Sequence, residues 1–147
     1  MAKSRVFLDS SVLVSALLSS RGGSFYILNQ LRDEFEFLIN DYVFEETLGV
    51  LNEKFTIRED LKDKLFLLMG LTPIKILKSP HSDELKTLSN IINKKDAPIL
   101  VSALKYSHYF LTLDNDFFAE PVIKFSKKKK LSILKPREFI QKFRKGR

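Results

Sequence analysis

The stretch KKDAPILVSALKYSHYFLTLDNDFF, residues 94–118, joins a helical pattern to an apolar strand and two closely spaced acids. Its first half predicts a helix over 97–107, with Pro98 in the first turn, where a missing backbone N–H is tolerated. Its second half predicts a buried strand over 109–113, directly followed by Asp114 and Asp116. A helix that leads into an apolar strand is one half of an alternating α/β unit, so this stretch indicates the fold class.

The same alternation extends toward both ends of the chain. Further strands are predicted over 6–8, 35–39, 73–77 and 131–135, and further helices over 11–20, 41–55, 58–70, 81–92 and 136–145. Such a sequence predicts an α/β fold, a three-layer α/β/α sandwich with a mainly parallel central sheet. Because no repeat or linker divides the sequence, we expect a single domain over residues 1–147.

Composition narrows the class of protein. The chain has 147 residues, 44% of them hydrophobic, which is enough to fill one compact core. It has no cysteine, which excludes disulfides, thiolate metal sites and thiol nucleophiles and fits a reducing compartment. No apolar stretch approaches the roughly 20 residues that span a bilayer, and the N-terminal segment reaches an acid too early for a secretory signal. We therefore expect a soluble, cytoplasmic protein with no membrane partner.

The charge balance points to a polyanionic partner. Lysine and arginine number 25 against 18 acids, for a formal net charge of +7, and nucleic acid is the first candidate for such a partner. The excess is concentrated late, in Lys127–Lys130 and in a basic tail over 142–147. Runs of this kind also occur as solvated loops and frayed tails, so both interpretations stay open.

Two predicted strands end in acid. Asp9 directly follows the strand 6–8, and Asp114 directly follows the strand 109–113. If these strands are parallel, both carboxylates emerge at the same edge of the sheet, which is where such folds bind ligands. Asp96 immediately precedes the helix 97–107, where it can cap the helix and still present an oxygen to a metal.

A fourth acid comes from the predicted helix 41–55. Glu45 and Glu46 are adjacent in it, and both lie outside its apolar arc, so helical periodicity does not choose between them. Carboxylates that converge on one point repel each other unless a cation neutralises them, and hard oxygen ligands suit Mg²⁺ or Mn²⁺. Such a metal activates water and stabilises charge at phosphorus. The pattern thus favours metal-dependent phosphodiester chemistry.

Other interpretations of the acid pair fit less well. A calcium loop needs an oxygen ligand and a glycine where Phe118 and Ala119 stand. A haloacid-dehalogenase-like phosphatase also has D-x-D after an apolar strand, but that motif normally opens the domain and has Thr or Val in place of Phe118. The glycine pair in RGGSF, 21–25, suits either a phosphate cradle or a flexible turn.

The positions of the histidines and serines in the sequence do not match those of catalytic or metal-binding residues. His81 and His108 match no ligand or general-base motif, and no His–Asp arrangement would activate Ser10 or Ser11 as a nucleophile. Water activation is therefore left to a metal, with a carboxylate as a further candidate base.

Three segments together resemble a known family. FLDSSVLVSALLS, INDYVFEETLGVL and the 94–118 stretch resemble the PIN domain, and within it the toxin-like (VapC-type) PIN ribonucleases of prokaryotes. The resemblance runs from about Arg5 to Phe118, and the D-A-x-I-L-x-x-A-L…Y-x-L-T-x-D-x-D-F pattern is its most specific part. The last strand and helix carry no motif of the family.

The resemblance implies a site. It makes Asp9, Asp96 and Asp114 metal-binding acids, Glu46 the glutamate that ligates the metal or positions the water, and Asp116 an accessory acid present in some members.

Further positions follow from the same match. Thr112 matches a hydroxyl residue that can orient a ligand, and Ser11 stands where many members have Asn. Thr47 stands where an apolar residue usually follows the glutamate, so the register of that helix is less certain. From the charge pattern we add four candidate nucleic-acid contacts: Lys94, Lys95, Lys127 and Lys128.

What the family implies is an endoribonuclease that hydrolyses RNA phosphodiester bonds with Mg²⁺ or Mn²⁺. Members often form homodimers, and many are toxins paired with an antitoxin whose segment covers the active site. The alternative is a non-catalytic PIN-like module that binds RNA or a protein. Metal occupancy and the effect of Asp9→Asn or Asp96→Asn on cleavage separate the two.

Overall fold

The computed structural model describes residues 2–144, and its centre is a five-stranded sheet. The strand order is β3-β2-β1-β4-β5, and all neighbouring strands are parallel. The strands are β1 (Ser4–Leu8), β2 (Phe35–Asn40), β3 (Lys75–Leu77), β4 (Tyr109–Leu111) and β5 (Ser132–Leu134). The chain builds the sheet outward from β1 in one direction and then, from β4 on, in the other. The order therefore switches between β1 and β4, which is where open parallel sheets form ligand sites.

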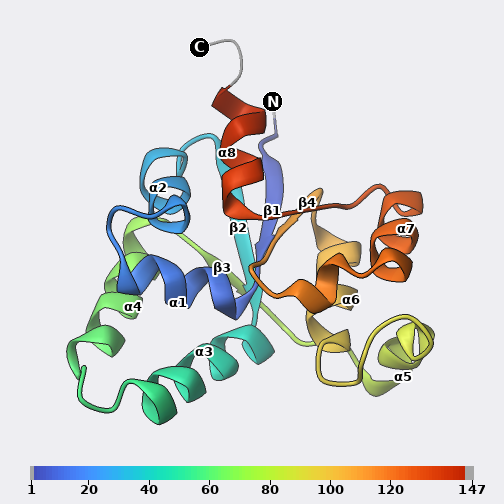
Figure 1. Ribbon diagram of the computed structural model, residues 1–147, viewed down its shortest axis with the longest axis horizontal. Helices are drawn as coiled ribbons and strands as arrows, with labels where there is room; N and C mark the ends of the chain where they lie inside the picture. Colours follow the sequence, from blue (N-terminus) through green and yellow to red (C-terminus); the bar gives the residue numbers. More distant parts are fainter. Residues whose placement is uncertain (1, 145–147) are drawn as a thin grey trace.

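Helices cover both faces of this sheet (Figure 1). The α-helices are α1 (Ser10–Leu18), α2 (Gly23–Gln30), α3 (Asp41–Lys54), α4 (Asp60–Leu71), α5 (Ser82–Leu85), α6 (Ala97–Tyr106), α7 (Glu120–Lys128) and α8 (Pro136–Arg144), with 3₁₀ turns η1 (Lys86–Leu88) and η2 (Asn115–Phe118). Helices α1 to α4 lie on one side, and α5, α6 and α7 lie on the other. The predicted three-layer α/β/α sandwich with a parallel sheet is confirmed.

The core follows from the apolar runs of the strands. Parallel strands are buried on both faces, so their residues are apolar without alternation. Phe7, Phe37 and Phe110 are fully or almost fully buried, and the rings of Phe7 and Phe110 lie 6.1 Å apart on neighbouring strands. Phe117, in the turn after the acids, packs edge-on against Phe110 at 4.9 Å. This contact anchors the acid-bearing turn to the core.

The last helix belongs to the same core. Phe139 of α8 is fully buried, with its ring 5.0 Å from that of Phe35 and 5.7 Å from that of Tyr109. The helix therefore packs onto the starts of β2 and β4, although it carries no family motif. Residue 145 of the predicted helix, and residues 145–147 of the predicted basic tail, lie outside the described residues.

One expectation for secondary structure is wrong, and one question that the sequence left open is answered. The predicted helix 81–92 is only the short α5 followed by η1 and turns. Of that segment's apolar residues only Leu88 and Ile92 are buried, too few to hold a continuous helix on the sheet. The Lys127–Lys130 run begins inside a helix, because α7 extends to Lys128, and Lys129 and Lys130 follow in an exposed turn. Helix α7 has Pro121 in its first turn and buries Val122 and Ser126, which lie one turn apart.

Among the described residues no single helix is both long and apolar enough to cross a membrane. The length and composition of such a span are met only by α1 and α2 together, and these two helices are bent by 94° relative to each other.

Candidate functional site

The acids gather at the carboxyl edge of the sheet, beside the switch in strand order. Asp9 directly follows β1 and precedes α1, and its backbone N–H donates to the Leu111 carbonyl of β4 at 3.0 Å. Asp114 follows β4 after a short connection. Two acids more than a hundred positions apart are thus held at one edge by adjacent strands.

Asp9 is the most buried of these acids, with 3% of its surface exposed. Its Oδ2 accepts hydrogen bonds from Ser11 Oγ at 2.7 Å and from Thr112 Oγ1 at 2.8 Å. Burial raises the pKa of Asp9 to about 6; the two hydroxyl hydrogen bonds oppose this rise, and the charges of Glu46 and Asp114 add to it. The site thus destabilises the ionised form of Asp9, which a bound cation would favour.

The two hydroxyls also organise the loop after β4. Thr112 Oγ1 accepts from the backbone N–H of Asp114 at 3.0 Å, and Ser11 Oγ accepts from that of Leu113 at 3.0 Å. Each hydroxyl therefore donates to Asp9 and accepts from the loop that carries Asp114. These hydrogen bonds fix Asp9 and Asp114 relative to each other.

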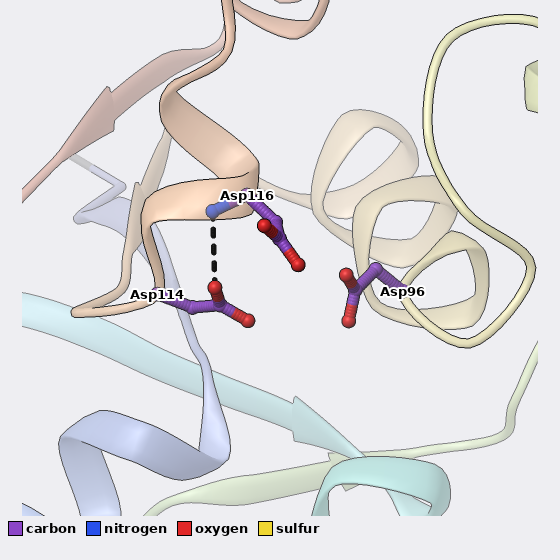
Figure 2. A group of neighbouring side chains, drawn as sticks. All are labelled: Asp96, Asp114 and Asp116. Carbon is purple, nitrogen blue, oxygen red and sulfur yellow. Dashed lines mark hydrogen bonds between the residues drawn. The ribbon is translucent and has the colours of Figure 1, made fainter.

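Three carboxylates point toward one another at the mouth of this edge (Figure 2). One oxygen from each of Asp96, Asp114 and Asp116 lies within 4.8 Å of the other two. Asp114 Oδ1 accepts from the Asp116 backbone N–H at 3.0 Å, so Asp114 is the residue that caps the 3₁₀ turn. The group thus includes Asp116, for which the sequence implies only an accessory role, and Asp9 lies outside it.

Asp96 reaches this group from the start of α6. It occupies the N-cap position with Pro98 in the first turn, but its side chain accepts no hydrogen bond from the helix, so it does not cap the helix as the sequence suggested. Its carboxylate accepts instead from Asn93 Nδ2 at 2.7 Å, while Asn93 Oδ1 accepts from the Asp96 N–H at 3.0 Å. Burial raises the pKa of Asp96, and the charges of Asp114 and Asp116 add to this effect.

Glu46 comes from α3 and is tied to α1. Ser10 Oγ donates to Glu46 Oε1 at 2.5 Å. Glu46 lines the same cavity as Asp9, Asp96 and Asp114, whereas Glu45 is exposed to solvent and is not among the lining residues of this cavity. Thr47 is fully buried and donates to the Val43 carbonyl at 2.8 Å, so its hydroxyl is satisfied where the family usually has an apolar side chain.

One cavity of about 580 Å³ connects these groups. It is lined by the four acids Asp9, Glu46, Asp96 and Asp114, by serines and apolar residues of α1, and by Lys54 and Lys95. Of the lysines predicted from charge, Lys95 therefore lies at the cavity and the exposed Lys94 is next to it in sequence. Lys127 and Lys128 are exposed in the last turn of α7 and do not line the cavity.

The glycine pair and the histidines have other surroundings. A side chain on Gly23 would bring Cβ within 3.2 Å of Ile140, so this position allows α2 to pack closely on α8. That contact supports a packing role over a phosphate cradle. His108 Nδ1 accepts from the Arg5 backbone N–H at 3.0 Å, just before β4 and away from the acids.

Some supporting residues were missed from the sequence. Asn93 orients Asp96, and its position three residues earlier in a polar turn was an available signal. Asn40, at the end of β2, caps α3 by accepting from Val43 N–H at 2.9 Å, and its Nδ2 donates to the Pro98 carbonyl at 3.1 Å. An Asn between an apolar strand and a helix is a recognisable cap, but its link to α6 is long-range.

The donor set fits a divalent cation. The carboxylates of Asp96, Asp114 and Asp116 converge, and Asp96 and the neighbouring Asp9 are buried. No ion pair within residues 2–144 neutralises any of these four acids. Hard oxygen donors in this number are typical of Mg²⁺ or Mn²⁺ sites and are unsuited to soft metals.

Comparison with known proteins identifies the fold. A family model described as "PIN domain" matches residues 6–121. No curated protein sequence matches the chain.

Several solved structures share the fold. VapBC2 from Rickettsia felis, bound to a DNA fragment from its promoter, has 18% identity and a TM-score of 0.65, covering 89% of this chain and 98% of that one. PAE2754 from Pyrobaculum aerophilum has 17% identity and a TM-score of 0.63, covering 97% of both chains. FitAcB from Neisseria gonorrhoeae has 17% identity and a TM-score of 0.58, covering 90% of this chain and 98% of that one. At these identities the likeness concerns the fold.

Proposed function

The chain belongs to the PIN domain family, and we propose that it is an endoribonuclease that hydrolyses RNA phosphodiester bonds with Mg²⁺ or Mn²⁺. The observation that carries this proposal is the convergence of Asp96, Asp114 and Asp116 within 4.8 Å, beside the buried Asp9, in a protein with net charge +7. An acidic centre in a protein with a positive net charge suits a polyanion that is cut with the help of a cation.

The residues have distinct proposed roles. Asp9, Asp96 and Asp114 would hold the metal, with Asp116 assisting, and Glu46 would ligate it or position the attacking water. When bound, the cation supplies positive charge to the phosphate oxygens and lowers the pKa of a water.

Hydroxyl and amide side chains around the acids hold three of the carboxylates by hydrogen bonds. Ser11 and Thr112 fix the Asp9 carboxylate, Asn93 fixes that of Asp96, and Ser10 fixes that of Glu46. Asp9, Asp96 and Glu46 are therefore oriented before any ligand enters, which reduces the reorganisation that metal and substrate binding would require.

The structural neighbours suggest a biological setting. VapBC2 is solved as a complex with a DNA fragment from its promoter. We propose that this chain is the toxin of a toxin–antitoxin pair, that an antitoxin covers its acidic site, that it acts as a homodimer, and that it works in the cytoplasm.

The direct test is cleavage of a mixture of single-stranded and structured RNA. The wild-type protein should cleave with Mn²⁺ and stop with EDTA, and Asp96→Asn should lower the rate by at least about 100-fold, because it removes an acid of the proposed metal site. Glu46→Gln should also lose most activity. Glu45→Gln removes the same charge one residue away and should cleave like wild type, since Glu45 is exposed and does not line the cavity.

Other outcomes would reject the proposal. Cleavage that survives both EDTA and Asp96→Asn would exclude the metal mechanism. No cleavage of any RNA, together with tight metal-independent RNA or protein binding, would instead favour the non-catalytic binding module.

A further inference from the structure

The cavity at the acids continues well beyond them. Its lining follows the facing sides of α1 and α3, which lie side by side and both run away from the carboxyl edge of the sheet (Figure 1). We call this extension the α1–α3 groove and define it by the lining residues beyond the acids: Val14, Ser15, Leu18, Ser19, Val50 and Lys54. The acids occupy one end of the groove, and Lys54 stands in the last turn of α3 at the other.

The walls of the groove include partly exposed apolar side chains. Leu18 is 43% exposed, and Val14 and Val50 are partly exposed. Val50 follows Glu46 by about one helical turn and Lys54 follows by about two, so the three side chains share one face of α3. An apolar strip that leads from a charged centre to a cation matches a chain of alternating bases and phosphates.

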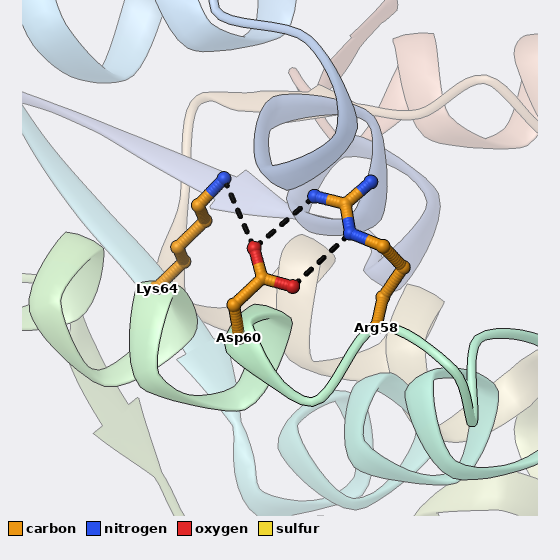
Figure 3. Close-up of polar contacts among 3 residues, drawn as sticks. All are labelled: Arg58, Asp60 and Lys64. Carbon is orange, nitrogen blue, oxygen red and sulfur yellow. Dashed lines mark hydrogen bonds and ion pairs between the residues drawn. The ribbon is translucent and has the colours of Figure 1, made fainter.

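Lys54 is a cation at its end of the groove that has no ion-pair partner among residues 2–144. Two basic residues further along the chain, Arg58 and Lys64, are both engaged by Asp60 (Figure 3). The exposed Lys62 lies on α4 and does not line the groove. Arg58 Nε and Lys64 Nζ lie 3.0 and 3.3 Å from Asp60 carboxylate oxygens. Lys54 takes part in no ion pair within residues 2–144, so its ammonium group is available to a phosphate.

We infer that the α1–α3 groove binds the single-stranded RNA segment that adjoins the cleaved bond, with bases against Val14, Leu18 and Val50 and a phosphate held by Lys54. This inference rests on the proposed ribonuclease function and adds to it the path of the RNA strand beyond the cleaved bond. Asp9 and Asp96 are only 3% and 2% exposed, so a base or phosphate must enter a cavity to reach them. Unpaired strands can turn their bases into such a cavity, whereas a duplex must first lose stacking and pairing.

The length of the groove sets the length of the segment. Two turns of α3 between Glu46 and Lys54 amount to about 12 Å. A stacked strand advances about 3.4 Å per nucleotide and an extended one advances more, so Lys54 meets a phosphate no more than about three nucleotides from the cleaved bond.

The test measures both binding and cleavage of oligouridylates of about three to about twelve nucleotides. Lys54→Gln should weaken binding of the longest RNA about two- to fivefold at moderate salt, the range expected for one exposed ion pair. It should also reduce the slope of log affinity against log salt concentration by about 0.7, the value for one phosphate contact on a single strand. The effect should shrink toward none as the RNA is shortened to the length that no longer reaches Lys54.

Two variants serve as controls. Lys54→Arg keeps the charge and should behave like wild type, and Lys124→Gln removes the same charge from an exposed position on α7, outside the groove. Circular dichroism and thermal unfolding show whether each variant is folded.

The outcomes separate this inference from the proposed function. If RNA is cut but Lys54→Gln and Lys124→Gln behave alike at every length, the groove inference is overturned and the ribonuclease proposal stands. If no RNA is cut but binding of the long strand still depends on Lys54, the groove binds single-stranded RNA and the ribonuclease proposal fails.

Discussion

At the scale of single residues, the site depends on how each carboxylate is held. Asp9 and Asp114 could be predicted from sequence because each ends an apolar run, and the ends of parallel strands share an edge. Tyr42 could not be assigned in the same way. Tyr42 donates from its hydroxyl to the Lys95 carbonyl at 2.8 Å, a contact between α3 and the turn before α6 that no local pattern encodes.

The buried Asp9 makes stability depend on pH. Its pKa is about 6 in the folded protein, above the value of about 3.9 for a free aspartate, so the protonated acid favours folding. This contribution is complete below about pH 4 and is lost as the pH rises through about 6. In EDTA, the free energy of unfolding of wild type should fall relative to that of Asp9→Asn between these values, by at most about 3 kcal/mol.

Urea unfolding of both proteins across this pH range measures the difference. Added Mn²⁺ should reduce the loss, because a cation stabilises the ionised carboxylate. A difference between the two proteins that stays constant with pH would show that Asp9 is not destabilised in its ionised form.

At the scale of helices and strands, periodicity predicted well where a segment buries a full face. The predicted helix 41–55 corresponds to α3 and the predicted strand 35–39 to β2, within one residue at each end. It failed for 81–92, where polar residues break the helix, and for α7, whose lysines conceal a narrow buried side made by Val122 and Ser126. In both segments a few tertiary contacts, rather than composition, decide the structure.

Helix α8 provides a test at this scale. Because Phe139 is fully buried among Phe35, Tyr109 and Phe143, Phe139→Ala should lower the free energy of unfolding by about 3–5 kcal/mol. Phe66→Ala is the matched control, since this ring is 58% exposed, and it should cost about 1 kcal/mol. Urea titration of the two variants compares them. Similar losses in both would mean that α8 is not part of the core.

At the scale of the whole molecule, the acids and the Lys127–Lys130 run lie at opposite edges of the sheet. The acids lie at the carboxyl edge. Lys127–Lys130 come just before the start of β5, at the opposite edge, where the Ser132 N–H donates to the His108 carbonyl at 3.1 Å. The composition predicted a polyanionic partner but could not place the basic surface, because positions distant in sequence determine which edge a lysine occupies.

The proposed RNA contacts at the two edges should therefore depend differently on the length of the RNA. Lys95 lines the cavity, so Lys95→Ala should weaken the binding of short and long RNA alike and reduce the salt slope by about 0.7. Lys127 and Lys128 lie outside the cavity, so replacing both with alanine should weaken only RNA long enough to reach the end of α7. Binding isotherms at several salt concentrations distinguish the two classes. Equal effects on a short RNA would contradict the assignment.

The central claim is that the acidic edge of this PIN domain holds a divalent metal, and Mn²⁺ binding tests it most directly. Isothermal titration at neutral pH should show saturable Mn²⁺ binding by wild type and by Glu45→Gln, and at least about tenfold weaker binding by Asp96→Asn and Asp114→Asn in folded protein. Equal Mn²⁺ binding by all four proteins would place the metal elsewhere, and no binding by wild type would contradict the claim.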